Sequence, residues 1–179
     1  MKKTLLITAL LLLLPGLQSM AQFPYRWQIG GNMGIGLTQY NLDDDAPGMS
    51  LTLSYNRVIG DSRWRWGIEA GLINQGLVDY GFEEDAPDSF VRPDYEYVGG
   101  FADYSIYSKN IFTLFARAGV APALRTNMYV YHNENLITVL GIAGIGFDLG
   151  PWRFNYNWYM ENDMTLTMMF SLGLFFGKK

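Results

Sequence analysis

The fold is decided by the stretch Arg26-Trp-Gln-Ile-Gly-Gly-Asn-Met-Gly-Ile-Gly-Leu-Thr38. Its bulky apolar residues fall on alternate positions, and the residues between them are small or polar. Because a strand points successive side chains to opposite faces, this segment has one apolar face and one polar face. The same alternation returns near the end of the chain, on a face formed by Leu166, Met168, Phe170, Leu172, Leu174 and Phe176.

Eight segments of the chain alternate in this way, and none shows a convincing helical period. About ten residues are enough for a tilted strand to cross a bilayer. Because an open sheet edge leaves backbone groups unpaired in lipid, strands that cross a membrane must close into a barrel. The sequence therefore predicts an all-β fold, an eight-stranded antiparallel up-and-down transmembrane β-barrel. The expected strands are Trp27–Thr38, Met49–Val58, Trp64–Gln75, Tyr95–Tyr107, Ile111–Ala121, Leu136–Leu149, Trp152–Tyr159 and Thr165–Phe176.

The first 21 residues are predicted to be a cleaved signal peptide, and residues 22–179 are predicted to form the barrel domain. Two lysines precede an apolar run from Leu5 to Leu14, and Ser19-Met20-Ala21 offers small residues before the cleavage point. A membrane-anchoring helix needs roughly 17–25 residues, and this apolar run is shorter. We therefore expect an exported protein of the outer membrane of a Gram-negative-type cell.

The charge balance and the residue content exclude some classes of function. Removing Lys2 and Lys3 from the 13 basic residues leaves 11 against 17 acidic residues, a net charge of −6. A mildly acidic, aromatic-rich chain is a poor candidate for binding nucleic acid. The chain has no cysteine, which excludes disulfides and a lipid anchor on an N-terminal cysteine. We expect no cofactor.

The connections between the expected strands alternate in length. Tight turns are expected at 60–63, 108–110 and 150–151, and longer links at 39–48, 76–94, 122–135 and, shorter, 160–164. Short turns at one rim and long links at the other are typical of outer-membrane barrels. Acidic side chains gather in the long links, where carboxylates could hold a hard divalent cation or form a solvated acidic surface. The candidate ligands are Asp43, Asp44, Asp45, Glu83, Glu84 and Asp85, and no metal site is assigned with them.

Aromatic residues concentrate at the ends of the expected strands. Amphipathic rings favour the two interfaces of a bilayer, so these positions predict two aromatic girdles. The alternative is that aromatic residues are simply favoured in strands. The short-turn ends carry Trp27, Trp64, Trp66 and Trp152, and the long-link ends carry Tyr40, Tyr95, Tyr97, Trp158 and Tyr159.

A soluble eight-stranded barrel would show the same alternation with its apolar face turned inward. Its outer face would then carry many charges, as soluble surfaces usually do. Here the less apolar face consists mostly of Gly, Ser, Thr, Asn and Gln, which suits a narrow interior. The composition of the two faces therefore favours a membrane barrel.

The interior of an eight-stranded barrel is just wide enough for side chains to fill it, so we expect no open pore. Alternation points several charged residues into this space, where an unpaired ion is costly. The sequence therefore predicts an ion-pair plug, with two amides, Gln28 and Asn32, nearby. Its charged members are Glu69, Asp103 and Arg117, joined near the short-turn rim by Arg65 and Arg153.

The signal peptide, the eight amphipathic strands and the unequal links resemble the small outer-membrane β-barrel family of OmpA-like, OmpX-like and opacity-type proteins, a porin-like fold. The resemblance covers residues 22–179 and rests on pattern rather than on a motif. It implies outer-membrane lipid, lipopolysaccharide and the barrel-assembly machinery as partners. That machinery commonly reads a terminal aromatic residue; here Phe176 fits the pattern, but Gly177-Lys178-Lys179 follow it.

These features indicate a non-enzymatic barrel with a structural or surface-recognition role. Its acidic, tyrosine-rich links would contact a surface ligand or an envelope protein, and the second link offers Tyr80, Phe82 and Phe90. Three alternatives stay open: an accessory barrel of a secretion or motility system, a narrow channel, and a lipid A-modifying enzyme. Residue types for the enzyme are present in His132, Asp88 and Ser89, although a serine two residues from the histidine is absent.

Overall fold

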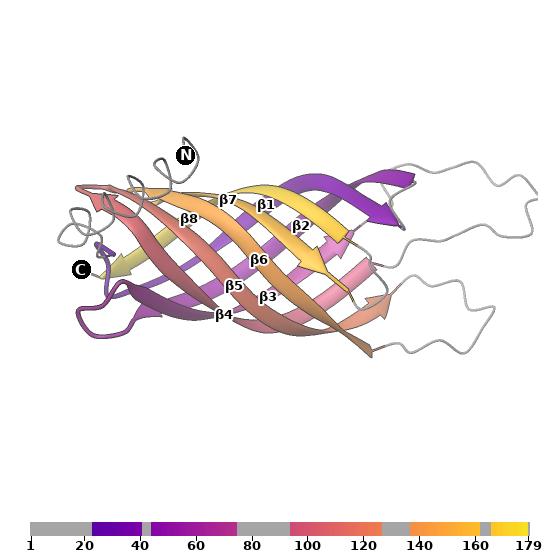
Figure 1. Cartoon of the computed structure of the whole chain (residues 1–179), viewed down its shortest axis with the longest axis horizontal. Helices are drawn as coiled ribbons and strands as arrows, with labels where there is room; N and C mark the ends of the chain where they lie inside the picture. The colour runs from indigo at the N-terminus through magenta and orange to yellow at the C-terminus, as the bar shows by residue number, and fades with distance from the viewer. Residues whose placement is uncertain (1–22, 41–43, 75–93, 127–136, 162–165, 179) are drawn as a thin grey trace, which may run out of the picture.

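The computed structural model describes residues 23–40, 44–74, 94–126, 137–161 and 166–178. Each strand pairs antiparallel with the next, and β1 also pairs with β8, which closes the barrel and confirms the predicted fold. The strands tilt around the barrel axis (Figure 1). They are β1 (Trp27–Tyr40), β2 (Asp44–Val58), β3 (Trp64–Asn74), β4 (Asp94–Lys109), β5 (Phe112–Thr126), β6 (Ile137–Leu149), β7 (Trp152–Met160) and β8 (Leu166–Lys178).

Tight turns join β2 to β3, β4 to β5 and β6 to β7 at one end of the barrel, which we call the short-turn end. Gly60, Asn110 and Gly150 in these turns have positive φ angles of 57°, 55° and 61°, a backbone region that Gly and Asn tolerate. The backbone N–H of Arg26 donates to the carbonyl of Lys178 at 2.8 Å, so the start of β1 and the end of β8 also lie here. The opposite end is the long-link end. Among the described residues, no helix is long and apolar enough to span a membrane.

The register aligns the apolar faces of neighbouring strands on the outside of the barrel. Met33 of β1 pairs with Leu51 of β2 and Leu172 of β8, and all three side chains are exposed. A slip of one residue would turn every one of these side chains inward, so the pattern fixes the register. Among the described residues, 28 large hydrophobic side chains are exposed, whereas the buried set holds 20 polar or charged and 13 hydrophobic residues. The outer wall is therefore apolar and the interior is largely polar.

Two expected strand ends were wrong by five residues, in both cases beside a proline, whereas the other ends differ by at most two residues. β2 begins at Asp44 rather than Met49, and Pro47 pairs only with Leu37 of β1, because β3 starts pairing at Met49. β5 continues to Thr126 through Pro122. Pro122 has no N–H to donate, and the pairing of β5 with β4 lapses at Ala121 and Pro122 while the pairing with β6 continues. A proline is tolerated inside a strand where the neighbouring strand on one side forms no ladder pair with it, because its missing N–H is not needed there.

Candidate functional site: a charged network in the barrel interior

Six charged side chains form one continuous network inside the barrel. Each is at most 4% exposed, and three are positive and three negative, so the network has no net charge. Signs alternate along the chain of ion pairs, in the order Glu69, Arg117, Asp103, Arg65, Asp148 and Arg153. The structure thus brings the five residues of the predicted plug together and adds Asp148 to them.

Asp103 of β4 lies at the middle of the network, because the register places it directly opposite Arg65 of β3 and Arg117 of β5. Its Oδ2 accepts a hydrogen bond from Nη2 of Arg65 at 2.7 Å, and its Oδ1 accepts one from Nε of Arg117 at 2.8 Å. Arg117 also donates from Nη1 to Oε2 of Glu69 at 3.0 Å. Opposite charges in facing positions stabilise neighbouring strands, and charge-assisted hydrogen bonds are the strong ones.

A second set of bonds crosses the interior instead of following the wall. Arg65 of β3 donates from Nη1 to Oδ2 of Asp148 on β6, at 2.8 Å. Asp148 faces Arg153 across the turn between β6 and β7 and accepts from its Nε at 2.6 Å. Oε1 of Gln28, on β1, accepts from both Arg65 and Arg153 at 2.8 Å. Except for the Asp148–Arg153 pair, which joins the neighbouring strands β6 and β7, these bonds join strands that are not neighbours in the wall.

Phenylalanine rings cover the three guanidinium groups of the network. The ring centroid of Phe101 lies 3.8 Å from the guanidinium carbon of Arg117, and the ring centroid of Phe175 lies 3.8 Å from that of Arg153. Phe23, which precedes β1, lies 4.1 Å from that of Arg65 and also packs against Phe115. A cation over a ring face is attracted to it, by up to about 2 kcal/mol when desolvated.

Tyrosine hydroxyls continue the network toward the long-link end. The hydroxyl of Tyr97 donates to Glu69 at 3.0 Å and lies 3.2 Å from that of Tyr159. Further along, Tyr95 donates to Glu161 at 2.5 Å, and Arg125 donates from Nε to the same carboxylate at 2.8 Å. The tyrosine rings pack with apolar side chains in a cluster that includes Ile73, Ala121, Ala123, Leu140, Ile142 and Met169. The interior is thus ionic toward the short turns and largely apolar toward the long links.

Tyr97→Phe is expected to lower the free energy of unfolding by about 1–2 kcal/mol, because the buried Glu69 carboxylate loses the hydrogen bond from Tyr97 and keeps the one from Arg117. Tyr156→Phe is the matched control, since this tyrosine is exposed on the outer wall. Urea titration of both variants in vesicles, followed by tryptophan fluorescence, measures the difference. An equal stability of the two variants would contradict the role given to the Tyr97 hydroxyl.

The aromatic positions divide between the outer wall and the interior. Four tryptophans at the short-turn ends are 40–48% exposed on the outer wall: Trp27, Trp64, Trp66 and Trp152. Trp158 is half-buried on the outer wall, and its ring meets Tyr156 edge-on. The second girdle was wrong for Tyr95, Tyr97 and Tyr159, which are buried in the interior. Strand alternation, which points these three residues inward, overrides their position near strand ends.

Other candidates are placed apart from the network or lie outside the described residues. Asn32 donates to Thr52 at 3.0 Å instead of joining the charged groups. Asp44 and Asp45 are the first residues of β2, and their side chains are not described. Within the described part of the chain, no three His, Cys, Asp or Glu residues gather as a metal site would require. Outside the described residues lie Asp43, Tyr80, Phe82, Glu83, Glu84, Asp85, Asp88, Ser89, Phe90 and His132.

The sequence analysis did not predict that Asp148 joins the network or that phenylalanine rings cover its guanidinium groups. It also did not predict the bonds of Glu161 with Tyr95 and Arg125. Asp148 alternates with the outward residues Phe147 and Leu149, so its inward direction was readable. Phe101, Phe115 and Phe175 could have been found by the same rule. Phe23 precedes the first strand, and no pattern points to it.

No protein-family model and no curated protein sequence matches the chain. Among solved structures, Neisserial surface protein A (NspA) is similar with a TM-score of 0.57 and 13% identity, over 84% of this chain and 96% of that one. Ail, the attachment invasion locus protein of Yersinia pestis, is similar with a TM-score of 0.46 and 14% identity, over 86% of this chain and 100% of that one. The fold of this chain is therefore that of the small eight-stranded β-barrels that its sequence resembles.

Proposed function

We propose that this chain is an outer-membrane β-barrel protein with a filled lumen and a structural or surface-recognition role that involves no catalysis. One observation carries the proposal: the barrel exposes its large hydrophobic side chains and buries its ion pairs. In water such a wall is unfavourable by about 25 cal/mol for each Å² of apolar surface. In a bilayer the same wall matches the hydrocarbon, and the polar interior is shielded from it.

Met33→Arg tests whether lipid covers the outer wall. Met33 is 65% exposed midway along β1, and an arginine there is expected to cost about 2–4 kcal/mol at the bilayer midplane. Ile111→Arg, in the turn between β4 and β5, is the control, and near an interface it is expected to cost about 0–1 kcal/mol. Guanidinium titration of the barrels in phospholipid vesicles gives both values. Equal, small costs would show that water wets the wall.

The reach of the network side chains across the interior supports the proposed filled lumen. Arg65 bonds to β1, β4 and β6, and Arg153 bonds to β1, β2 and β6. Moving an ion through these bonds would separate buried charge pairs, which is costly. We expect the wild-type barrel to show no steady conductance in planar bilayers. Uniform channel openings at low voltage would overturn the filled lumen and support the narrow channel.

The recognition role rests on the long links, whose acidic and aromatic composition contrasts with the short turns. With the leader directing export, the long-link end would face the cell exterior, as in outer-membrane barrels generally. Lipopolysaccharide, the barrel-assembly machinery and a surface ligand or envelope protein are the proposed partners. Chymotrypsin added to intact expressing cells should cut after Tyr80 or Phe82 in the second link. Cleavage only after the envelope is opened would contradict this orientation.

A further inference from the structure

Exposed cations gather at the short-turn end of the barrel. Among the described residues, the exposed charged side chains at this end are four cations and one carboxylate: Arg26, Arg57, Lys109, Lys178 and Asp61. The ion-pair network behind the wall is balanced and does not alter this excess. The outer surface at this end is therefore basic, although the whole chain carries a net charge of −4.

Two of these cations belong to one row of outward side chains that crosses four neighbouring strands. Trp27 of β1 pairs with Lys178 of β8 on one side and with Arg57 of β2 on the other. Arg57 pairs in turn with Trp66 of β3. All four side chains are exposed, and cations alternate with indole rings along the row. We call these four residues the basic row.

The spacing of the basic row allows its two cations to reach one anion. Neighbouring strands lie about 4.8 Å apart, so the backbones at Arg57 and Lys178 are roughly 10 Å apart, with Trp27 between them. Both side chains have long, flexible stems that can bring their charged ends toward each other over the indole ring. A group held between them would be bound by two positive charges.

The two cations have no counter-charge of their own among the residues that the structure describes. No carboxylate there forms an ion pair with Arg57 or Lys178. The tryptophans of the row mark the level of a bilayer interface, where lipid phosphates lie. A guanidinium binds phosphate through two parallel N–H bonds, and an ammonium binds it as a point charge. The chemistry of the basic row therefore fits the phosphodiester of a lipid headgroup.

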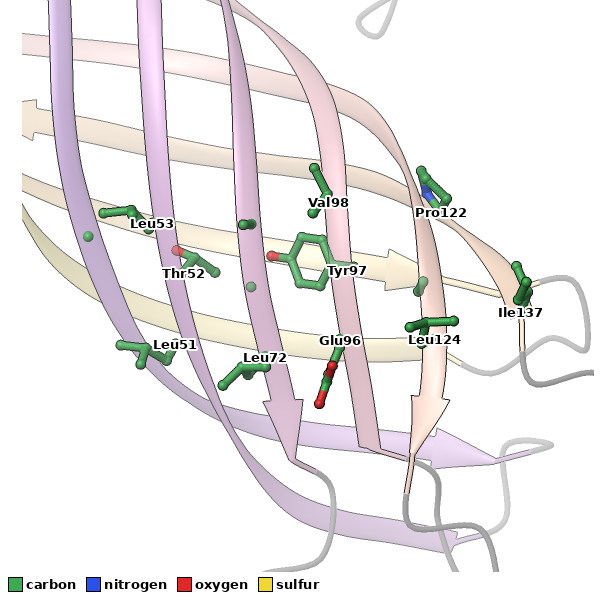
Figure 2. A pocket seen from close by; sticks show the side chains of 14 residues that line it. Leu51, Thr52, Leu53, Leu72, Glu96, Tyr97, Val98, Pro122, Leu124 and Ile137 are labelled. Atoms are coloured by element: carbon green, nitrogen blue, oxygen red, sulfur yellow. The ribbon is translucent and has the colours of Figure 1, made fainter. Parts of the chain in front are cut away.

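The wall beyond the basic row is apolar and offers a path for an acyl chain. The next outward pair is Ile29 with Tyr55, and the residues after these are Gly31 and Leu53. A hollow of about 790 Å³ in the outer wall has Gly31 and Leu53 in its lining (Figure 2). Along β2 the rise from Arg57 to Leu53 is about 13 Å, less than the roughly 15 Å of one hydrocarbon leaflet. An acyl chain whose headgroup lies at the basic row therefore reaches this edge of the hollow.

We propose that the basic row binds one anionic phospholipid, with its phosphodiester between Arg57 and Lys178 over Trp27 and an acyl chain directed to the hollow at Gly31 and Leu53. The proposal rests on the proposed function, whose orientation places the short-turn end in the leaflet opposite lipopolysaccharide. Charge selects the headgroup. An anionic lipid is attracted by both cations, whereas phosphatidylethanolamine carries an ammonium that they repel.

Native mass spectrometry can test the proposal on the full barrel. The refolded protein is incubated with equal amounts of phosphatidylglycerol and phosphatidylethanolamine of identical acyl chains, then released from detergent. The wild-type barrel should retain one phosphatidylglycerol in preference to phosphatidylethanolamine. Arg57→Gln and Lys178→Gln should each reduce that preference about fivefold, the effect of one cation at an anionic lipid surface.

Lys109→Gln is the matched control for these substitutions. Lys109 is exposed at the same end but lies outside the basic row, so the same loss of charge there should leave the preference unchanged. An equal reduction in Lys109→Gln and Arg57→Gln would overturn the proposal, because net charge alone would then attract the lipid. Equal retention of both lipids by the wild-type barrel would also overturn it.

Excess inorganic phosphate distinguishes a lipid site from a site for free anions. The retained phosphatidylglycerol should persist in its presence, because contact of the acyl chain with the wall adds to the contact of the headgroup. Displacement of the lipid by inorganic phosphate would overturn the proposal in favour of an anion site.

Failure of this proposal is separable from failure of the proposed function. A barrel that inserts into vesicles and migrates compactly before heating, yet shows no lipid preference, removes the lipid site alone. A chain that stays dissolved without detergent removes the membrane location and the lipid site together.

Discussion

Asp103→Asn is expected to lower the free energy of unfolding by about 3–5 kcal/mol, because it leaves a buried charge network unbalanced. Asp103 is fully buried and is the shared partner of Arg65 and Arg117. The substitution leaves three guanidinium groups against two carboxylates, and each of these five side chains is at most 4% exposed. Guanidinium titration of the barrel in phospholipid vesicles, followed by tryptophan fluorescence, measures the loss.

Asp61→Asn provides the matched control for this substitution. Asp61 is exposed in the turn between β2 and β3, where a charge interaction is worth little, so the same chemical change there should alter stability by no more than about 1 kcal/mol. Glu69→Gln should fall between the two, because Arg117 would keep Asp103 as a partner. A stability of Asp103→Asn close to that of the Asp61 variant would show that the network contributes little to the folded state.

Strand alternation made the architecture and the direction of most side chains predictable from the sequence. The inward direction of Arg65, Glu69 and Asp103 follows from position alone, because a two-residue period fixes the face. The structure places all three in one buried network. Closure was also predictable, because an apolar outer face in lipid requires every backbone group to be paired within the sheet.

The partners within the network were not predictable, because they depend on register and on strand tilt. The pair of Arg65 with Asp103 requires the register of β3 against β4, across a link of 19 residues that the structure does not describe. The bond from Arg65 to Asp148 crosses the interior, and only the stagger of a closed barrel determines which residues face each other there. A single sequence contains the period of each strand but no direct measure of these offsets.

The strand end expected at Pro122 and the girdle position expected for Tyr97 were wrong because both relied on local residue preferences. The pairing and alternation of strands in the closed barrel outweigh those preferences. Pro122 indicated a strand end, yet it lies inside β5 where one neighbouring strand leaves it unpaired. Tyr97 indicated an interface girdle, yet the alternation of β4 points it inward, where Glu69 accepts its hydrogen bond. Strand period is therefore the stronger rule in this fold, and residue preference applies only to positions that already face outward.

The Arg153 end of the network allows charge balance to be tested by comparing a single substitution with a double one. Arg153 is an end member, and Asp148 is its ion-pair partner among the described residues. Asp148 also pairs with Arg65, which keeps Asp103 when Asp148 is lost. Removing Asp148 alone therefore isolates one guanidinium, whereas removing Asp148 and Arg153 together leaves two positive and two negative groups that still alternate in sign.

Asp148→Asn is accordingly expected to cost about 3–5 kcal/mol, because the charge of Arg153 then stays buried with no carboxylate partner, and only neutral amide oxygens, those of Gln28, Asn56 and the introduced asparagine, can accept from it. Asp148→Asn with Arg153→Met should be more stable than Asp148→Asn alone, with a coupling of about 0.5–3 kcal/mol. The methionine fills similar volume against Phe175 without needing a counter-charge. A double-mutant cycle in vesicles gives the coupling. Additive losses would mean that Arg153 acts through packing alone, and charge balance would then not be what holds this end of the barrel together.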